Sequence, residues 1–268
     1  MSQLEACILG VSVWGPGLEG WAASREVLAG RAPYEPRPSP PPAPSILSAN
    51  ERRRTGPVVR LALAVAHEAA EMCRLPPESL QSVFASSSGD GVVVGSILDA
   101  LTRPGNEQRV VSPTQFHNSV HNAAAGYWSI ATGSRQPATC LGCHDATFAA
   151  GLLKAMVEVA CDERAVLLCV YDHPLPAPMD ARRPIDVPFA VALVLALQEP
   201  GTAMARLSVR YEPSPATTAL PRRSALQRLP AQNAVAGSMR MLEALACGTA
   251  DSHALAYLDG HLTVDIRP

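Results

Sequence analysis

The residues best suited to chemistry lie in one short segment, where a cysteine stands just ahead of a helix. Residues 138–151 read as a short strand, a tight connection and an alanine-rich helix, with Cys143 in the connection. Backbone N–H groups and the dipole at a helix N-terminus favour negative charge, and therefore a thiolate. Cys143 is the candidate nucleophile, and His144 is either a local base for it or a solvent-facing group. We expect Asp145 to be the N-cap of the helix, and Cys140, inside the strand, to be inert.

Three further patterns could bind metals or phosphates. Cys140 and Cys143 have the spacing of half a zinc site or a redox pair, but no second pair at ligand spacing follows. His117 and His121 stand four residues apart without the carboxylate of an HExxH motif. Ser86–Gly91 lacks the Gly-Lys-Ser/Thr ending of a phosphate-binding loop and reads as a strand-to-helix turn near Cys143. We therefore predict no metal and no cofactor.

The elements that must position Cys143 alternate between strands and helices. Apolar patterning predicts strands at Ala6–Trp14, Ser82–Ser87, Pro137–Gly142, Arg164–Tyr171 and His261–Ile266, and helices at Leu18–Ala29, Pro57–Cys73, Val93–Leu101, Val120–Ile130, Asp145–Ala160 and Ser224–Cys247. Pro188–Leu197 and Met204–Tyr211 are predicted to form a hairpin across Glu199–Gly201. Arg31–Ser45 is proline-rich and is expected to be an extended surface loop. This order predicts a layered α/β domain with a mixed sheet.

Composition excludes several classes of protein. The chain has 268 residues, 47% hydrophobic but only 4% aromatic, so its core must be built from Ala, Val and Leu. A net charge of −2 without a basic stripe argues against a nucleic-acid partner. The N-terminus does not read as a signal peptide, and no apolar run is long enough for a membrane span. Seven scattered cysteines indicate reduced thiols in a cytoplasmic protein.

Several segments together resemble one family, the β-ketoacyl synthases of the thiolase superfamily. The elbow Gly142–Asp145, followed by an alanine-rich helix, is similar to the family's elbow and places Cys143 at its acyl-accepting position. The other similar segments, in the family's order, are Ala6–Gly17, Trp21–Gly30, Glu51–Arg54, Leu61–Ala66 and Ser112–Gly126. The resemblance covers about residues 5–172 and weakens in 173–268, a hairpin, helix and strand extension. It implies one thiolase-like domain over 1–268, corresponding to one half of the β-ketoacyl synthase fold.

The resemblance also implies what a complete condensing enzyme would need. In this family two histidines, one in an HGT-type motif, and a lysine act in decarboxylation and condensation from the C-terminal half. No HGT motif occurs here, and His253 and His261 stand in contexts that do not match. Loss of a donor aimed at an oxyanion costs roughly 100- to 1000-fold in rate. We therefore expect no chain elongation by this polypeptide alone.

The favoured interpretation is a chain-length-factor-like or accessory subunit of a β-ketoacyl synthase in acyl-carrier-protein-dependent fatty-acid or polyketide elongation, including aryl polyene systems. The resemblance implies a full-length synthase or a second copy, and acyl carrier protein, as partners. Thr114–Tyr127 and Pro137–Gly142 are expected at the subunit contact. Residues expected in this contact or lining a substrate tunnel are Thr114, Phe116, Asn118, Val120 and Asn122.

Two alternatives stay open at the level of the sequence. The chain could be an autonomous cysteine-dependent acyltransferase or thioesterase-like enzyme, in which Cys143 works with His144 or with another histidine brought in by folding. It could instead be a homodimeric scaffold that binds acyl carrier protein without catalysis. In the subunit and scaffold interpretations Cys143 is a vestige.

Overall fold

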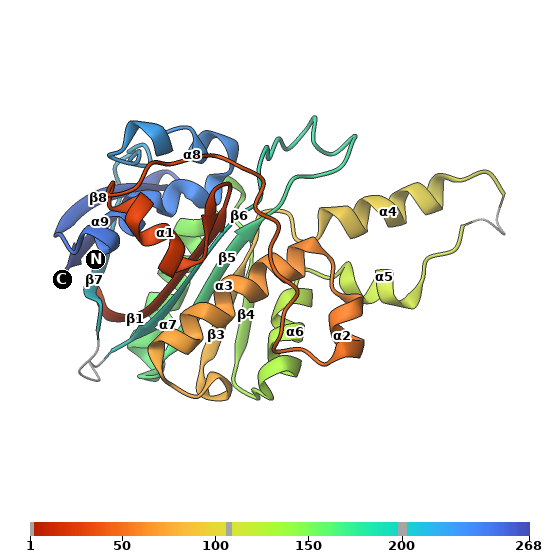
Figure 1. Cartoon of the computed structure of the whole chain (residues 1–268), viewed down its shortest axis with the longest axis horizontal. Helices are drawn as coiled ribbons and strands as arrows, with labels where there is room; N and C mark the ends of the chain where they lie inside the picture. Colours follow the sequence, from red (N-terminus) through yellow and green to blue (C-terminus); the bar gives the residue numbers. More distant parts are fainter. Residues whose placement is uncertain (1–2, 106–108, 198–202) are drawn as a thin grey trace.

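The computed structural model describes residues 3–105, 109–197 and 203–268, and its centre is one nine-stranded sheet (Figure 1). The strands are β1 Leu4–Gly15, β2 Leu18–Glu19, β3 Gln81–Ala85, β4 Ala138–Leu141, β5 Val166–Asp172, β6 Phe189–Ala196, β7 Ala205–Glu212, β8 Asp251–Tyr257 and β9 Gly260–Arg267. Their order is β4-β3-β5-β6-β1-β7-β9-β8, with β2 paired to β1. β3 runs parallel to β4 and β5, whereas the remaining described pairs are antiparallel, so the sheet is mixed as predicted.

The helices are α1 Trp21–Leu28, α2 Ala49–Arg54, α3 Pro57–Cys73, α4 Gly91–Thr102, α5 Pro113–Asn118, α6 Ala123–Thr132, α7 Thr147–Asp162, α8 Leu229–Gln232 and α9 Met239–Cys247. α3 has the predicted bounds. The predicted first helix begins later, because Leu18 and Glu19 pair with β1 as β2. None of the helices in the described part of the chain is long and apolar enough to cross a membrane.

The predicted hairpin of 188–197 and 204–211 is wrong. Both segments are strands, β6 and β7, but β1 lies between them and pairs with each. The turn expected at Glu199–Gly201 lies outside the described residues. Local patterning identified both strands, but it carries no information about which strand each one adjoins, so a short connection suggested a direct pair.

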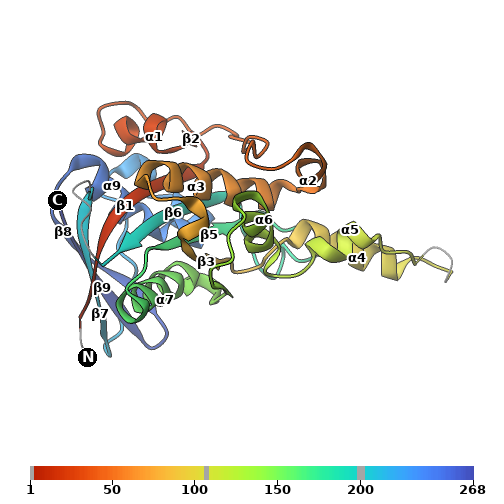
Figure 2. The ribbon, with the colours of Figure 1, turned by 90° about the horizontal axis from the view of Figure 1, so that it is seen from below.

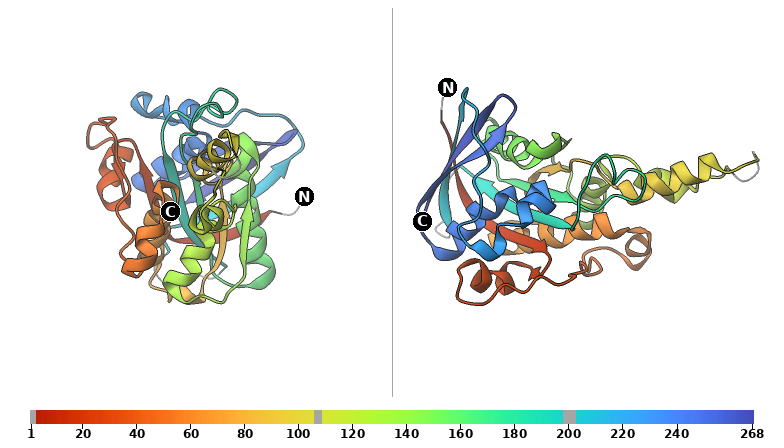
Figure 3. Two further views of the ribbon diagram at one scale, coloured as in Figure 1. Left: turned by 90° about the vertical axis from the view of Figure 1, so that its right-hand side faces the viewer. Right: turned by 90° about the horizontal axis from the view of Figure 1, so that it is seen from above.

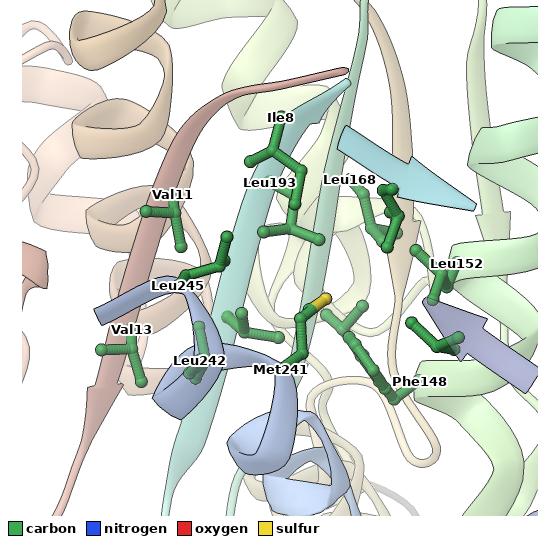
Figure 4. Packing of buried hydrophobic residues seen from close by; sticks show 14 of the residues in the cluster. Ile8, Val11, Val13, Phe148, Leu152, Leu168, Leu193, Met241, Leu242 and Leu245 are labelled. Carbon is green, nitrogen blue, oxygen red and sulfur yellow. The ribbon is translucent and has the colours of Figure 1, made fainter. Parts of the chain in front are cut away.

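Helices cover both faces of the sheet (Figure 2). α3 and α6 pack on one face, where β1 contributes Leu9. α7 and α9 lie on the other face, where they pack in one cluster with Ile8 of β1, Leu168 of β5 and Leu193 of β6 (Figure 4). The C-terminal segment therefore completes the cover of a sheet face that α7 alone would leave partly bare.

A bulge in β1 keeps its apolar side chains on the correct faces. The register with β6 shifts between Ile8 and Gly10, so Ile8 joins the same cluster as Val11 and Val13, although in a regular strand it would lie on the opposite face from them. A Cβ at Gly10 would overlap the carbonyl oxygen of Ala69 in α3. Glycine at this position therefore allows α3 to lie close against the sheet.

One part of the chain projects from the body. α4 and α5 extend beyond the sheet as an arm, residues 91–105 and 109–120, which Figures 1 and 3 show from three directions. The predicted helix Val120–Ile130 corresponds to α6, which begins at Ala123, ends at Thr132 and packs on α3.

Candidate functional site

The candidate site lies where the carboxyl ends of β3, β4 and β5 meet. These three strands are parallel, so their last residues reach the same edge of the sheet. Ser86 follows β3, Cys143 follows β4, and Asp172 ends β5. Ligand sites in α/β sheets form outside such strand ends. The sheet therefore brings the elbow together with side chains from distant parts of the sequence.

Cys143 stands in a tight elbow between β4 and α7, as predicted. A single 3₁₀ turn, His144–Ala146, leads into α7. Thr147 holds the elbow closed: its hydroxyl accepts from the Cys143 N–H at 2.9 Å and donates to the His144 carbonyl at 2.7 Å. His144 has φ of +49°, a strained conformation for a residue with a side chain. The Cys143 side chain is half-buried.

Asp145 is not the helix N-cap that the sequence predicted. The extra 3₁₀ turn moves the start of α7 to Thr147, and Ala146 takes the cap position without a side-chain bond. Asp145 instead forms an ion pair with Arg183, which approaches from the segment between β5 and β6. No local pattern pointed to Arg183, which lies 38 residues further along the chain.

His144 faces the same arginine and not the thiol. Its ring nitrogens lie 3.3 Å from Nη1 of Arg183 and, through Nδ1, 3.3 Å from the Asp145 carboxylate. Within the described residues, no hydrogen bond reaches the Cys143 sulfur. The expected role of His144 as a local base stays without structural support, because its contacts are to Arg183 and Asp145.

Below the elbow, a buried carboxylate ties β5 to the end of β3. One oxygen of Asp172 accepts from the Ser86 hydroxyl at 2.9 Å and from the Ser87 N–H at 2.8 Å. Burial raises the pKa of Asp172, while these hydrogen bonds and the charge of Arg183 oppose the rise. The side chain is almost fully buried, so it acts as a structural anchor of the site's floor.

Ser86–Gly91 is the predicted strand-to-helix turn and lies directly beside the elbow. A Cβ at Gly142 would lie 2.6 Å from the Ser86 carbonyl oxygen, so glycine permits the close approach of β4's end to this turn. Asp90 caps α4 by accepting from the Val93 N–H at 3.0 Å. Burial raises the pKa of Asp90, against the N–H bonds of its own helix start.

His117 and His121 make different contacts and do not face a common site. His121 contacts the carbonyl oxygen of Leu141 through Nε2 at 3.0 Å, next to the elbow. His117 instead packs edge-on against Tyr127, with ring centroids 6.0 Å apart. In the described ranges no group of three or more metal-ligating side chains comes together.

Among the predicted contact or tunnel residues, Asn118 has a structural role. It is buried, donates to the Arg54 carbonyl at 2.9 Å and accepts from the Tyr127 hydroxyl at 3.0 Å. Phe116 and Val120 are largely exposed, at 69% and 45%. Thr114 and Asn122 are exposed too. The arm thus presents Phe116 and Val120 to the outside, while Asn118 fastens it to α2.

Cys140 is half-buried in β4, and burial raises the pKa of its thiol. This reduces the fraction of reactive thiolate.

An open hollow of about 480 Å³ adjoins the elbow. Its walls include His144 and Arg183 from the elbow side and Thr218, Gln232 and Gly237 from the C-terminal segment. Cys143 itself does not line it. The charged side chains of the elbow therefore face this hollow, whereas its thiol does not.

Comparisons with known proteins agree with this fold. Residues 24–253 match the family model described as the beta-ketoacyl synthase N-terminal domain, which extends the resemblance well beyond residue 172. No curated protein matches the chain by sequence.

Solved structures cover nearly the whole chain. A structure of the ketosynthase ApeO in complex with its chain length factor ApeC from Xenorhabdus doucetiae aligns with a TM-score of 0.72 at 20% identity, over 98% of this chain and 99% of that one. The ishigamide ketosynthase/chain length factor gives 0.70 at 14% identity, over 98% of each chain. A type II polyketide synthase acyl-carrier protein in complex with its ketosynthase, AntDE:AntF, gives 0.74 at 11% identity, over 99% of each. At these identities the likeness shows the thiolase-like fold, as predicted.

Proposed function

Because the chain belongs to the β-ketoacyl synthase N-terminal domain family, we propose that it is an accessory, chain-length-factor-like subunit that pairs with a complete β-ketoacyl synthase. The pair would elongate acyl chains on an acyl carrier protein in a fatty-acid or polyketide pathway, aryl polyene pathways included. The solved relatives that support this setting are a ketosynthase with its chain length factor and a ketosynthase with its acyl-carrier protein.

The observation that carries the proposal is the exposed apolar surface of the arm. Five large apolar side chains there are between 45% and 70% exposed: Leu98, Leu101, Val110, Phe116 and Val120. Exposed apolar side chains gathered on one projecting element mark a protein interaction site. A partner that covers the arm would remove this surface from water.

A free strand edge adds to this surface. β4 ends the sheet and pairs with β3 alone among the described strands. Its backbone N–H and C=O groups on the other side are open to a strand from another chain. The expected contact segments, Pro137–Gly142 and Thr114–Tyr127, contain this edge and α5, and His121 links them through Leu141. The two segments therefore support one continuous contact with the synthase.

The elbow supports an accessory role over independent catalysis. A cysteine nucleophile needs a partner that takes its proton, held within hydrogen-bond reach. Here His144 is engaged by Arg183 and Asp145. The alternative, an autonomous acyltransferase or thioesterase, has no observation in its favour.

The test is complex formation with the complete synthase of the same pathway. We expect the two chains to co-purify and elute together in gel filtration at micromolar concentration. Phe116→Asp should weaken the complex by about tenfold or more, because a charge would be buried against an apolar partner surface.

Leu258→Asp is the matched control. Leu258 is 72% exposed in the turn between β8 and β9. β8 lies at the end of the molecule away from the arm (Figure 1). This variant should bind like the wild type. Absence of any complex, or equal weakening by both variants, contradicts the proposal.

A further inference from the structure

We infer that residues 173–188, called the strap here, link the arm mechanically to the elbow, so that a displacement at the base of the arm changes the exposure of Cys143. The strap joins β5 to β6 and passes beside the start of α4, where Figures 1 and 3 show it in teal. This inference deepens the proposed function and rests on it for the nature of the partner that would move the arm.

The arm end of the strap packs on two glycines. Gly91 and Gly95 are both buried and lie one turn apart on α4. A Cβ at Gly95 would lie 2.7 Å from Cγ of Pro176 and 3.4 Å from Cε of Met179. A Cβ at Gly91 would overlap the side chain of Leu175. Glycines at these positions let the strap lie directly against the helix backbone.

The elbow end of the strap is Arg183. Its guanidinium pairs with Asp145 and contacts both ring nitrogens of His144 at 3.3 Å. These two residues are the first two of the 3₁₀ turn that immediately follows Cys143. The Arg183 side chain is only 16% exposed, whereas that of Asp145 is 69% exposed, so packing holds the arginine in place more firmly than the aspartate.

The two ends are joined by a short hydrogen-bonded turn. The Met179 N–H donates to the Pro176 carbonyl at 3.0 Å, and the Met179 carbonyl accepts from the Arg183 N–H at 2.9 Å. The residue that touches Gly95 is therefore bonded directly to the residue that holds the elbow. A turn with this bonding moves as a unit more readily than it stretches.

The two ends of the strap, where it leaves β5 and enters β6, are both held by one further residue. The Asn233 side chain donates to the carbonyls of Val187, at 2.9 Å, and of Asp172, at 3.3 Å. Asn233 is itself buried. Because Asn233 holds both ends of the strap, a displacement of Pro176 and Met179 by the arm is transmitted to the elbow.

The test uses the isolated chain and the alkylation rate of Cys143 by iodoacetamide, followed by peptide mass spectrometry. Gly95→Ala adds a methyl group that pushes the strap from the arm. We expect it to raise the Cys143 rate about fivefold or more, because the elbow turn opens more often when Arg183 is displaced. Cys161, exposed near the end of α7, is the internal reference and should keep its rate.

Gly126→Ala is the matched control. Gly126 is also a helical glycine, in α6, but a Cβ there meets nothing within 4 Å. This variant should leave the Cys143 rate unchanged. An unchanged rate in Gly95→Ala, or equal rates in both variants, overturns the inference.

A second pair of variants examines the elbow end. Arg183→Ala and Arg183→Lys should both accelerate alkylation, because lysine keeps the charge but not the planar fork that spans His144 and Asp145. Wild-type reactivity in Arg183→Lys would assign the effect to charge alone and overturn the positioning role. These outcomes need no partner protein, so they are independent of whether a complex with the synthase forms.

Discussion

At the scale of single residues, Cys143 shows how far a pattern can specify a site. Its position between a strand and a helix followed from residue order, and the structure confirms it. Of its surroundings, only the turn Ser86–Gly91 followed from the sequence. Arg183 contacts Asp145 from 38 residues further along the chain. Asp172 bonds to Ser86 and Ser87, and the pairing of β3, β4 and β5 brings these strand ends to the same edge as the elbow.

Removal of the thiol tests whether Cys143 acts in the proposed complex. If the chain is an accessory subunit, Cys143→Ala should leave the elongation rate of the complex with its synthase within about twofold of the wild type, since no acyl transfer passes through this thiol. Product formation from a malonyl-primed carrier protein measures this rate.

The equivalent cysteine substitution in the synthase is the control and should abolish elongation. A loss of more than about a hundredfold in Cys143→Ala, with the complex intact, would instead make this thiol catalytic.

At the scale of elements, local periodicity predicted the bounds of helices and strands well, but it predicted the neighbours of each strand poorly. α3 was predicted to the residue because its apolar positions recur over 17 residues behind an N-terminal proline. The pairing of β6 and β7 was wrong, because a strand's alternation does not encode its neighbour. β8 was missed altogether, since its inward positions include Asp251 and His253 where an apolar pattern was expected.

Glu68 offers a test of how α3 fixes the first helix. Its carboxylate accepts from the Trp21 N–H at 2.8 Å, at the start of α1, and from the Ser12 hydroxyl of β1. Glu68→Ala should lower the free energy of unfolding by about 1–2 kcal/mol, because α1 loses the acceptor for its first-turn N–H.

Urea unfolding followed by circular dichroism measures the change. Glu71→Ala, on the same helix, removes an exposed carboxylate whose contact is His67 at 3.5 Å. It should alter stability by less than about 0.5 kcal/mol. Equal losses in the two variants would show that the α1 contact contributes nothing.

At the scale of the whole molecule, the C-terminal segment completes the cover of the sheet face on which α7 packs. α9 shares an apolar cluster with α7 (Figure 4), and a charged cluster joins α9 to β8. Asp251 accepts from Arg240 at 2.9 Å and contacts Nδ1 of His253 at 3.0 Å. Sequence composition predicted a core of small aliphatic residues, but not this buried polar group at its border.

His253 makes the stability of this region depend on pH. Burial lowers the pKa of His253 below its usual 6.5, although the Asp251 carboxylate opposes the shift. Below about pH 6.5 the unfolded chain therefore binds a proton that the folded chain excludes. As far as this group is concerned, the free energy of unfolding has its full value above that pH. It falls as the pH drops further, by at most about 1.4 kcal/mol per pH unit.

Urea unfolding at several values between about pH 5 and 7 measures the slope. His253→Asn, which keeps a side-chain amide donor near Asp251 but does not titrate in this range, should flatten the slope relative to the wild type. A parallel slope in the variant would assign the pH dependence to other groups.

The central place of β1 has a consequence for synthesis. This strand is synthesised before its two main neighbours, residues 190–196 and 205–209, so Val13 cannot pair with Val191 until β6 has been made. Until then the nascent polypeptide carries an unpaired, apolar strand. Any translation product that stops before β6 therefore lacks the middle of its sheet and is a substrate for chaperones or proteases, whatever the quality of its helices.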